Sequence, residues 1–208
     1  TRLGIINGQS FKAKPLILRN NQIKTRYYAL DKEGHATHTN SQLAKEAVVK
    51  LLDQDFDLSK VEILSCGTTS PDQLLPAHAA MVHGELGGHT MEINSASGAC
   101  SAGIQALKFG YLSVLSGSAN NAVCTGSERF SRWMLAKFFK EEAAKVARLE
   151  GDGIIAFEKD FLRFMLSDGA GAALLQSAPN PSGVSLKIEW IEQRSFANEL
   201  PTCMYAGA

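Results

Sequence analysis

The stretch TMEINSASGACSAGIQALKFGYLSVL, residues 90–115, combines a short strand-like run, a turn of small residues and a long helix-like segment. Residues 90–96 form the strand-like run. Residues 99–115 place Ile104, Leu107, Tyr111 and Val114 on one stripe, which is the spacing of an α-helix. A strand joined to a helix by a tight turn is the repeating unit of α/β proteins. The stretch therefore predicts a strand, a sharp turn and a helix that covers a sheet.

The same alternation continues on both sides of this stretch. Helices are predicted at residues 41–52, where Ser41 can cap the first turn, and at residues 76–86, where Pro76 suits the first turn. The remaining strand-like runs are residues 61–70, 120–128, 170–177 and 184–195. The last two flank the turn APNPSG, so we expect them to be antiparallel neighbours. The pattern predicts an α/β fold with a mixed, mainly parallel five-stranded sheet covered on both faces.

Composition and charge are those of an ordinary globular protein. The 208 residues include 45% apolar and 20% charged side chains, enough for one large domain or a tight pair. Lys plus Arg and Asp plus Glu both number 21, whereas nucleic-acid-binding proteins usually carry a basic face. No apolar run is long enough to cross a bilayer, and residues 1–15 lack a signal-peptide pattern. We therefore expect a cytoplasmic protein with neither nucleic acid nor membrane as partner.

The four cysteines are widely spaced and form no Cys-x-x-Cys pair. This spacing argues against a zinc ribbon or a thioredoxin-like site and favours free thiols in a reducing compartment. Cys66 and Cys124 lie inside strand-like runs and are predicted to be core residues, while Cys203 lies near the end of the chain. Cys100 differs because it stands among small residues, between a strand and a helix.

Cys100 has two interpretations. As a nucleophile, it would benefit from the helix N-terminus, where unpaired N–H groups and the helix dipole stabilise a thiolate. Small neighbours such as Gly98 would admit a thioester, and amides of the turn could stabilise an oxyanion. As a structural residue, Cys100 would be a small hydrophobe at a helix–sheet contact, which is common for free cysteines. Position alone does not separate the two.

Four motifs in order resemble the β-ketoacyl-acyl-carrier-protein synthase III family of the thiolase superfamily. NSASGACSAG (94–103) resembles the active-site segment of that family, and MLSDGAGAALLQS (165–177) resembles its Asp-Gly-Ala-Gly-Ala strand. NQIKTRYYA (21–29) is similar to its entry motif, with Gln22 where glycine is usual, and ILSCGTTS (63–70) fits in order and spacing. The resemblance implies a thiolase-like fold, of which this chain would be the N-terminal αβα half.

The resemblance also implies an acyltransferase in fatty acid or polyketide biosynthesis. Cys100 would accept an acyl group from a thioester before a decarboxylative Claisen condensation, with Ala99 and Ser101 beside the bound substrate. Leu75 stands where the family has a side chain, usually phenylalanine, that crosses the dimer interface and limits the acyl pocket of the partner. The chain lacks a tryptophan near Leu16, where the family often stacks one on the coenzyme A adenine. That difference favours a carrier-protein-bound acyl group.

Domain organisation follows from the same resemblance. We expect one thiolase-like N-terminal domain over residues 1–208, with a charged helical insertion at about 129–161. The histidine and asparagine of the family lie in a homologous C-terminal half that is absent from this chain. The expected partners are an acyl carrier protein or a coenzyme A thioester, and a second subunit in a homodimer or heterodimer, without any cofactor. The long insertion resembles the branch that makes dialkylresorcinol-type secondary metabolites.

Two alternative functions remain open on the sequence. The chain could be a non-catalytic fragment or partner subunit of a thiolase-fold heterodimer. It could also be a non-decarboxylating acyltransferase that uses Cys100 alone. In the partner interpretation, Cys100→Ala should leave the activity of the complex intact.

Three other features are interpreted as structural. The glycines of DGAGAA (168–173) lead into a strand, which is the wrong context for a nucleotide loop, and would allow close strand–helix packing. HGELGGH (83–89) does not match the His-Glu-x-x-His pattern, and with His78 it predicts no metal site. A basic group could meet an acidic carrier protein, but we prefer the interpretation that it forms a solvated helix face. Its members are Arg129, Arg132, Lys137 and Lys140. Six large apolar side chains are expected to pack the insertion onto the body of the domain rather than to line an acyl pocket. They are Phe138, Phe139, Phe157, Phe161, Phe164 and Met165.

Overall fold

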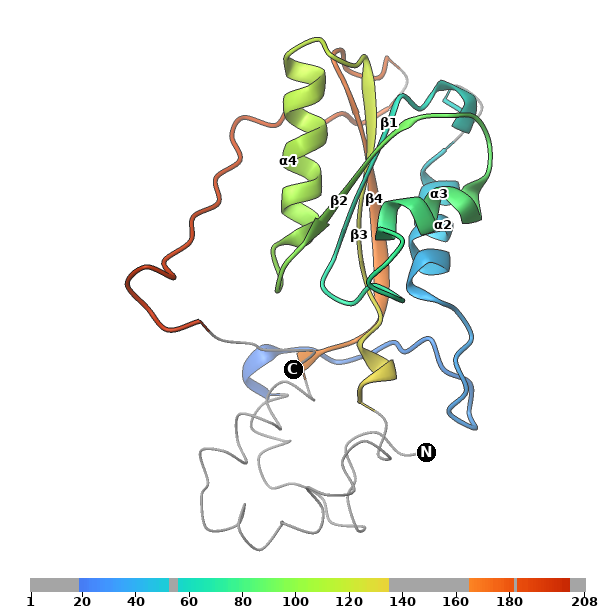
Figure 1. The fold of residues 1–208 in the computed structure, drawn as a ribbon, viewed down its shortest axis with the longest axis vertical. Coiled ribbons are helices and arrows are strands. Elements are labelled where there is room, and N and C mark those ends of the chain that lie inside the picture. The colour runs from blue at the N-terminus through green and yellow to red at the C-terminus, as the bar shows by residue number, and fades with distance from the viewer. Residues whose placement is uncertain (1–18, 53–55, 135–164, 182, 203–208) are drawn as a thin grey trace, which may run out of the picture.

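A computed structural model describes residues 19–52, 56–134, 165–181 and 183–202. Within them, four strands form one sheet in the order β2-β1-β3-β4 (Figure 1). The strands are β1 (Ile63–Thr68), β2 (Glu92–Ser97), β3 (Asn121–Glu128) and β4 (Gly169–Gln176). β1 runs parallel to β2 and β3, whereas β4 is antiparallel to β3. The predicted mixed, mainly parallel sheet is therefore confirmed, with four strands in the described part of the chain.

The fifth predicted strand, residues 184–195, is wrong. These residues form an extended arm without strand pairing, and β4 pairs with β3 instead of with this segment. Figure 1 shows the arm running away from the sheet. Three of its apolar side chains are exposed, Val184 at 94%, Leu186 at 89% and Trp190 at 78%. Alternating apolar residues predict a strand only where a neighbouring strand can pair with them, and no described strand lies beside the arm.

Three helices cover the sheet, α2 (Asn40–Leu51) and α3 (His78–Leu86) on one face and α4 (Ala102–Leu115) on the other (Figure 1). Thr39 caps α2 through a reciprocal capping box with Gln42, so the expectation that Ser41 caps it is wrong. α3 begins two residues after Pro76, and α4 begins at Ala102. Two 3₁₀ turns are also described, η1 (Leu58–Lys60) and η2 (Phe130–Arg132).

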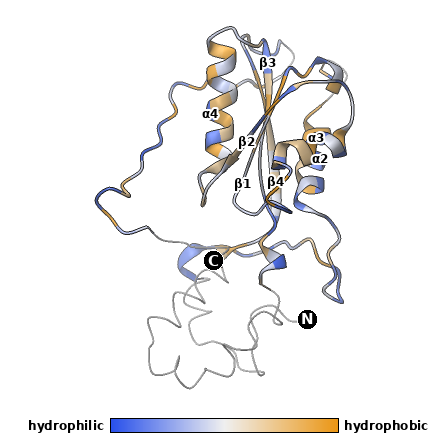
Figure 2. Cartoon of the chain, viewed as in Figure 1, coloured by the Kyte–Doolittle hydropathy of each residue, from blue (hydrophilic) through white to orange (hydrophobic). Residues whose placement is uncertain are grey.

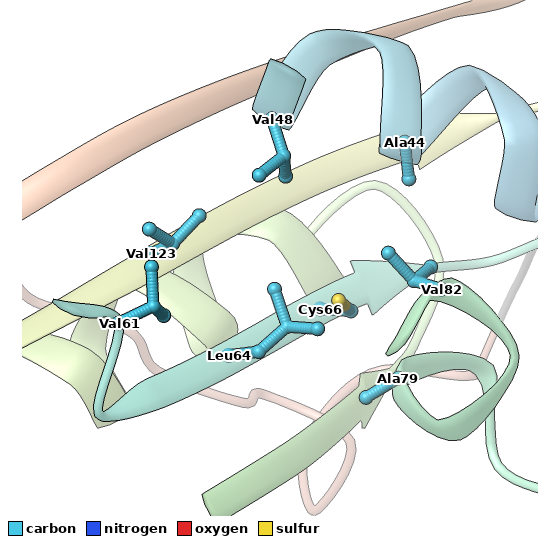
Figure 3. Packing of buried hydrophobic residues seen from close by; sticks show 8 residues of the cluster. All are labelled: Ala44, Val48, Val61, Leu64, Cys66, Ala79, Val82 and Val123. Atoms are coloured by element: carbon cyan, nitrogen blue, oxygen red, sulfur yellow. The ribbon is translucent and has the colours of Figure 1, made fainter. Parts of the chain in front are cut away.

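The main apolar core lies between the sheet and the helices α2 and α3. Figure 3 shows its eight residues, Ala44, Val48, Val61, Leu64, Cys66, Ala79, Val82 and Val123. A second cluster, on the α4 side, contains Ile63, Ala119, Ala122 and Cys124. Every residue of β1 is buried, as expected of a central parallel strand covered on both faces. The prediction that Cys66 and Cys124 are core residues is confirmed.

α4 meets the sheet through its small residues. Its buried positions are Ala102, Ala106 and Gly110. A Cβ on Gly110 would stand 2.4 Å from the sulfur of Cys124, and one on Gly103 would stand 3.4 Å from Cα of Gly126. The prediction that the glycines of DGAGAA allow close strand–helix packing is wrong, because a Cβ on Gly169 or Gly171 meets nothing within 4 Å.

Figure 2 colours several turns of α4 as hydrophobic. Ile104, Leu112 and Leu115 are exposed. Of the predicted stripe, Leu107 and Val114 pack against the cluster on the α4 side of the sheet, whereas Ile104 does not. The small residues allow the helix axis to lie so close to the strands that larger side chains must point sideways or outward. Among the described helices, none has the length and apolar character needed to cross a bilayer.

Candidate functional site

Cys100 lies at a sharp turn between β2 and α4. Its backbone is left-handed, with φ of 58°, and Gly98 two residues earlier has φ of 153°. Left-handed backbone is uncommon outside glycine and costs about 1–3 kcal/mol, so the surrounding structure must hold it. The Cys100 thiol is free and the residue is exposed. The turn therefore presents the thiol outward at the start of α4, which argues against the interpretation of Cys100 as a core residue.

Hydrogen bonds from three segments hold this turn. The Thr69 hydroxyl donates to the carbonyl of Gly98 at 2.9 Å, from the segment that follows β1. The Gln105 amide donates to the Ser101 hydroxyl at 3.0 Å, from the second turn of α4. The Gln193 amide of the arm donates to the Ser101 carbonyl at 3.2 Å. We call residues 98–101 the Cys100 turn.

The turn stands at the sheet edge where β1, β2 and β3 all end. The chain passes from central β1 to edge β2 and then back across β1 to β3. α3 makes the first connection on one face and α4 makes the second on the other (Figure 1). In open α/β sheets, ligands bind at such a reversal, outside the carboxyl ends of the strands. Cys100 lies in the connection that makes the reversal.

Glu128, the last residue of β3, faces the segment that follows β1. Its carboxylate accepts the Thr69 amide at 2.7 Å, the Ser70 hydroxyl at 2.5 Å and the Thr68 hydroxyl at 3.4 Å. Ser70 in turn accepts the Arg129 amide at 2.9 Å. We call residues 68–70 the β1 turn.

Asp72 continues this polar region toward α2. Its carboxylate accepts the backbone amides of Asn40 and Ser41, each at 2.9 Å, and pairs with Arg129 at 3.3 Å. Arg132 donates to the carbonyls of Pro71 and Asp72 at 3.2 and 2.9 Å. Arg129 and Arg132 thus hold the residues after the β1 turn, and the interpretation of these two arginines as part of a solvated helix face is wrong.

His78 is buried at the start of α3. Its Nε2 lies 3.1 Å from the Ser127 hydroxyl, while its Nδ1 has no partner. Burial lowers the pKa of His78, and the carboxylates of Asp72 and Glu128 oppose that shift. His83 meets the carbonyl of His89 at 3.0 Å. Within the described ranges, no group of three or more His, Cys, Asp or Glu residues could hold a metal ion.

The other thiols differ from Cys100 in their surroundings. Burial raises the pKa of Cys66 to about 11 and that of Cys124 to about 12. Since the thiolate is the reactive form, we expect these two cysteines to react slowly in the folded protein. Cys203 lies outside the described residues.

The other predicted substrate residues lie around the same edge. Ala99 is exposed beside Cys100, and Ser101 is half-buried at the N-cap of α4. Leu75 is 82% exposed, in the segment between the β1 turn and α3. No described contact joins Leu75 to Cys100, so its place at a subunit interface stays a prediction.

Asp168 has a structural role. Its carboxylate accepts the backbone amides of Ala29 and Ser131 at 2.8 and 2.9 Å, and its own amide donates to Tyr27. The chain itself thus satisfies this buried carboxylate. Of the insertion, the described part ends at Met134. The rest of the predicted helical insertion, with Lys137, Lys140 and its five phenylalanines, lies outside the described residues.

Sequence reasoning missed the residues that support Cys100, namely Thr69, Gln105, Glu128 and Gln193. A usable signal existed for two of them. Polar residues at the ends of parallel strands meet at one sheet edge, and both GTTS and TGSE end predicted strands. Gln105 and Gln193 carried no such signal, because one lies within a helix and the other lies in a segment predicted as a strand.

Curated proteins similar in sequence to this chain are named β-ketoacyl-[acyl-carrier-protein] synthase III. The β-ketoacyl-[acyl-carrier-protein] synthase III of Clostridium perfringens (strain 13 / Type A) is 29% identical over 163 residues, 78% of this chain and 42% of that protein. The corresponding synthase III 1 of Lactiplantibacillus plantarum is 28% identical over 176 residues, 84% of this chain and 46% of that protein. This chain thus spans less than half the length of these curated relatives. No family model matches it.

Solved structures agree with the sequence relatives. A tetronic acid condensing enzyme, AbyA1, superposes with a TM-score of 0.57 at 25% identity, over 76% of this chain and 43% of that one. A 3-oxoacyl-(acyl-carrier-protein) synthase III superposes with a TM-score of 0.58 at 22% identity, over 79% and 42%. The thiolase-like α/β fold expected from the motifs is thereby confirmed. The dialkylresorcinol branch stays a prediction.

Proposed function

We propose that this synthase III-like chain carries the nucleophile of a carbon–carbon-forming acyltransferase, with Cys100 accepting the acyl group. The observation that carries the proposal is the geometry of Cys100, a free and exposed thiol on a left-handed turn. The Cys100 turn directly precedes α4 and lies at the sheet edge where α/β proteins bind ligands. The relatives named β-ketoacyl-[acyl-carrier-protein] synthase III support the reaction class.

The first half-reaction needs the elements of this edge. The Cys100 sulfur attacks the thioester carbonyl carbon, the carbonyl π electrons move to oxygen, and the oxyanion collapses to expel the carrier thiolate. The proton of Cys100 ends on that leaving thiol, and the acyl group stays on sulfur. Backbone amides at the start of α4 suit the developing oxyanion, because helix N-termini stabilise negative charge.

The second half-reaction needs groups beyond this chain. A malonyl-type extender loses carbon dioxide, and the resulting carbanion attacks the acyl group on Cys100 and expels its sulfur. The family resemblance assigns the stabilisation of this carbanion to a histidine and an asparagine of a homologous second unit. Neither step calls for a cofactor, because the thiol and the decarboxylating extender supply both electron pairs.

The uncovered apolar surfaces support such a second unit. Ile104, Leu112 and Leu115 are exposed on α4, and the arm exposes Val184 and Trp190. Apolar surface on two neighbouring elements is typical of a protein–protein contact. We propose that a second α/β unit covers α4 and the arm, and that Leu75 lies at a contact between subunits.

The substrate assignment follows the same proposal. An acyl carrier protein delivers the acyl group, with Ala99 and Ser101 beside the bound thioester, in fatty acid or polyketide biosynthesis in the cytoplasm. A second candidate is a non-catalytic partner subunit, which the same exposed surfaces favour, because such a subunit also needs a large contact.

An intact-mass experiment separates these candidates. The purified chain is incubated with an acyl-carrier-protein thioester, alongside Cys100→Ala and, as a matched control, Cys66→Ala. We expect one added acyl mass on the wild type and on Cys66→Ala, and none on Cys100→Ala. A folded wild-type chain that gains no mass contradicts the acyltransferase proposal and favours the partner subunit.

A further inference from the structure

The carboxylate of Glu128 binds a segment that leads directly to the Cys100 turn. Both of its oxygens accept hydrogen bonds from the β1 turn, at 2.7 Å from the Thr69 amide and 2.5 Å from the Ser70 hydroxyl. Hydrogen bonds to an ionised acceptor are shorter and about twice as strong as neutral ones. Because Ser70 also accepts the Arg129 amide at 2.9 Å, the end of β3 and the β1 turn are tied at two points.

Thr69 extends this connection to the Cys100 turn. Its amide faces Glu128, and its hydroxyl donates to the carbonyl of Gly98 at 2.9 Å. One residue thus joins the carboxylate to the first residue of the Cys100 turn. The amide must keep its place for the hydroxyl to reach Gly98, because both groups belong to the same residue.

The Cys100 turn needs such support. Gly98 at φ of 153° and Cys100 at φ of 58° are both left-handed. Strained backbone persists only where its surroundings over-determine it. On the α4 side, Gln105 holds Ser101 at 3.0 Å. On the β1 side, the described contact is the one from Thr69. Without it, the Gly98 carbonyl loses this hydrogen bond, and we expect the start of the turn to move although Gln105 and Gln193 still hold Ser101.

We propose that Glu128 is a positioning residue that holds the Cys100 turn through Thr69. It does not touch the reacting atoms and takes no part in proton transfer. Glu128 holds the β1 turn in place, and the β1 turn holds Gly98 through the Thr69 hydroxyl. The thiol of Cys100 therefore stays at the sheet edge. The catalytic consequence rests on the proposed function of Cys100, whereas the mechanical coupling does not.

A double-mutant cycle tests the coupling. The variants are Glu128→Ala, Thr69→Val and the double variant, since Thr69→Val removes only the hydroxyl that reaches Gly98. The readouts are the single-turnover rate of Cys100 acylation by the thioester and the hydrogen exchange of amides 98–103. We expect each single variant to slow acylation about tenfold and the double variant to be no slower than the slower single, because coupled residues are not additive. Exchange of amides 98–103 is expected to rise in all three.

Two further variants separate positioning from general stability. Glu128→Gln keeps a carbonyl oxygen for the Thr69 amide, and we expect it to restore most of the acylation rate. Glu62→Ala is the matched control, because the Glu62 carboxylate accepts the Asn120 amide at 3.0 Å and its side chain at 2.8 Å beside the opposite end of β3. Glu62→Ala is expected to lower the melting temperature while leaving acylation and exchange at 98–103 unchanged.

Each outcome bears on one proposal. If Glu128→Ala is folded and acylated at the wild-type rate, with unchanged exchange at 98–103, the positioning inference is overturned while the acyltransferase proposal stands. The inference is also overturned if the double variant slows acylation about hundredfold, which is the product of the two single effects. Glu128 would then act independently of Thr69. If the wild type itself is not acylated, the proposed function fails, and exchange alone decides the positioning. Should Glu128→Ala not fold, Glu128→Asp, which shortens the side chain by one methylene, takes its place in the cycle with the same expected and contradicting results.

Discussion

The carbonyl oxygen of Ala102 occupies the place where a side chain on Gly67 would begin. A Cβ on Gly67 would stand 2.1 Å from that oxygen and 2.6 Å from the amide nitrogen of Gly103. The first turn of α4 therefore lies directly against β1. This contact sets how far Cys100 projects beyond the sheet edge, because the Cys100 turn immediately precedes Ala102.

The Gly67–Ala102 contact predicts a large effect of one methyl group. Gly67→Ala should lower the free energy of unfolding by about 1–3 kcal/mol or prevent folding, because backbone atoms cannot move aside as a flexible side chain can. Gly84→Ala is the matched control: Gly84 lies within α3, and a Cβ there meets nothing within 4 Å. It should raise stability by about 0.5–1 kcal/mol through helix propensity. Urea titration measures both, and equal stabilities for the two variants would contradict the contact.

The three described thiols should differ in reactivity. With Cys203→Ser as background, iodoacetamide at pH 8 should alkylate Cys100 first and leave Cys66 and Cys124 unmodified until the chain unfolds. The reason is that burial raises the pKa values of Cys66 and Cys124 to about 11 and about 12, so little thiolate exists at that pH. Peptide mapping after timed quenching gives the order. Equal alkylation rates at Cys66 and Cys100 in the folded protein would contradict the prediction, because they would mean that the reagent reaches the core around Cys66.

Stability should fall on mild acidification because of His78. Burial lowers its pKa below the ordinary value of 6.5, so the unfolded chain binds the proton first as the pH falls. The stabilisation from the neutral imidazole is present above 6.5 and is lost as the pH falls toward the folded-state value, by at most about 1.4 kcal/mol per pH unit. His78→Gln should flatten this slope in urea titrations between pH 7 and 5. His83→Gln, on the same helix, should keep the wild-type slope, and an unchanged slope in His78→Gln would refute the assignment.

The apolar outer face of α4 should drive association. Replacing Ile104, Leu112 and Leu115 together by Gln should weaken association about tenfold or more, with helicity unchanged, because exposed apolar area is the attractive surface. Sedimentation velocity over a concentration series measures the change. Val49→Gln is the control, since Val49 is also exposed, at 47%, but belongs to α2 on the other face. Identical sedimentation of the triple variant and the wild type would exclude this face as the contact.

Local patterns predicted most of the sheet and much of the helices. Strand and helix periodicities located β1 to β4 and α2 to α4 within a few residues, because each pattern follows from which side of an element is buried. The errors lie where burial depends on a distant neighbour. The arm has the alternation of a strand but no described partner strand. Thr39 rather than Ser41 caps α2, because the helix begins at Asn40 and the capping box therefore joins Thr39 to Gln42.

The sequence by itself determined the α/β class and the place of Cys100 between a strand and a helix, because both depend on short-range spacing of apolar and small residues. Only the tertiary structure decided what holds Cys100. Thr69 reaches Gly98 across 29 positions of the chain, and Glu128 reaches Thr69 across 59. Such contacts exist only after parallel strands have aligned their carboxyl ends, and no local periodicity encodes which polar side chains then meet.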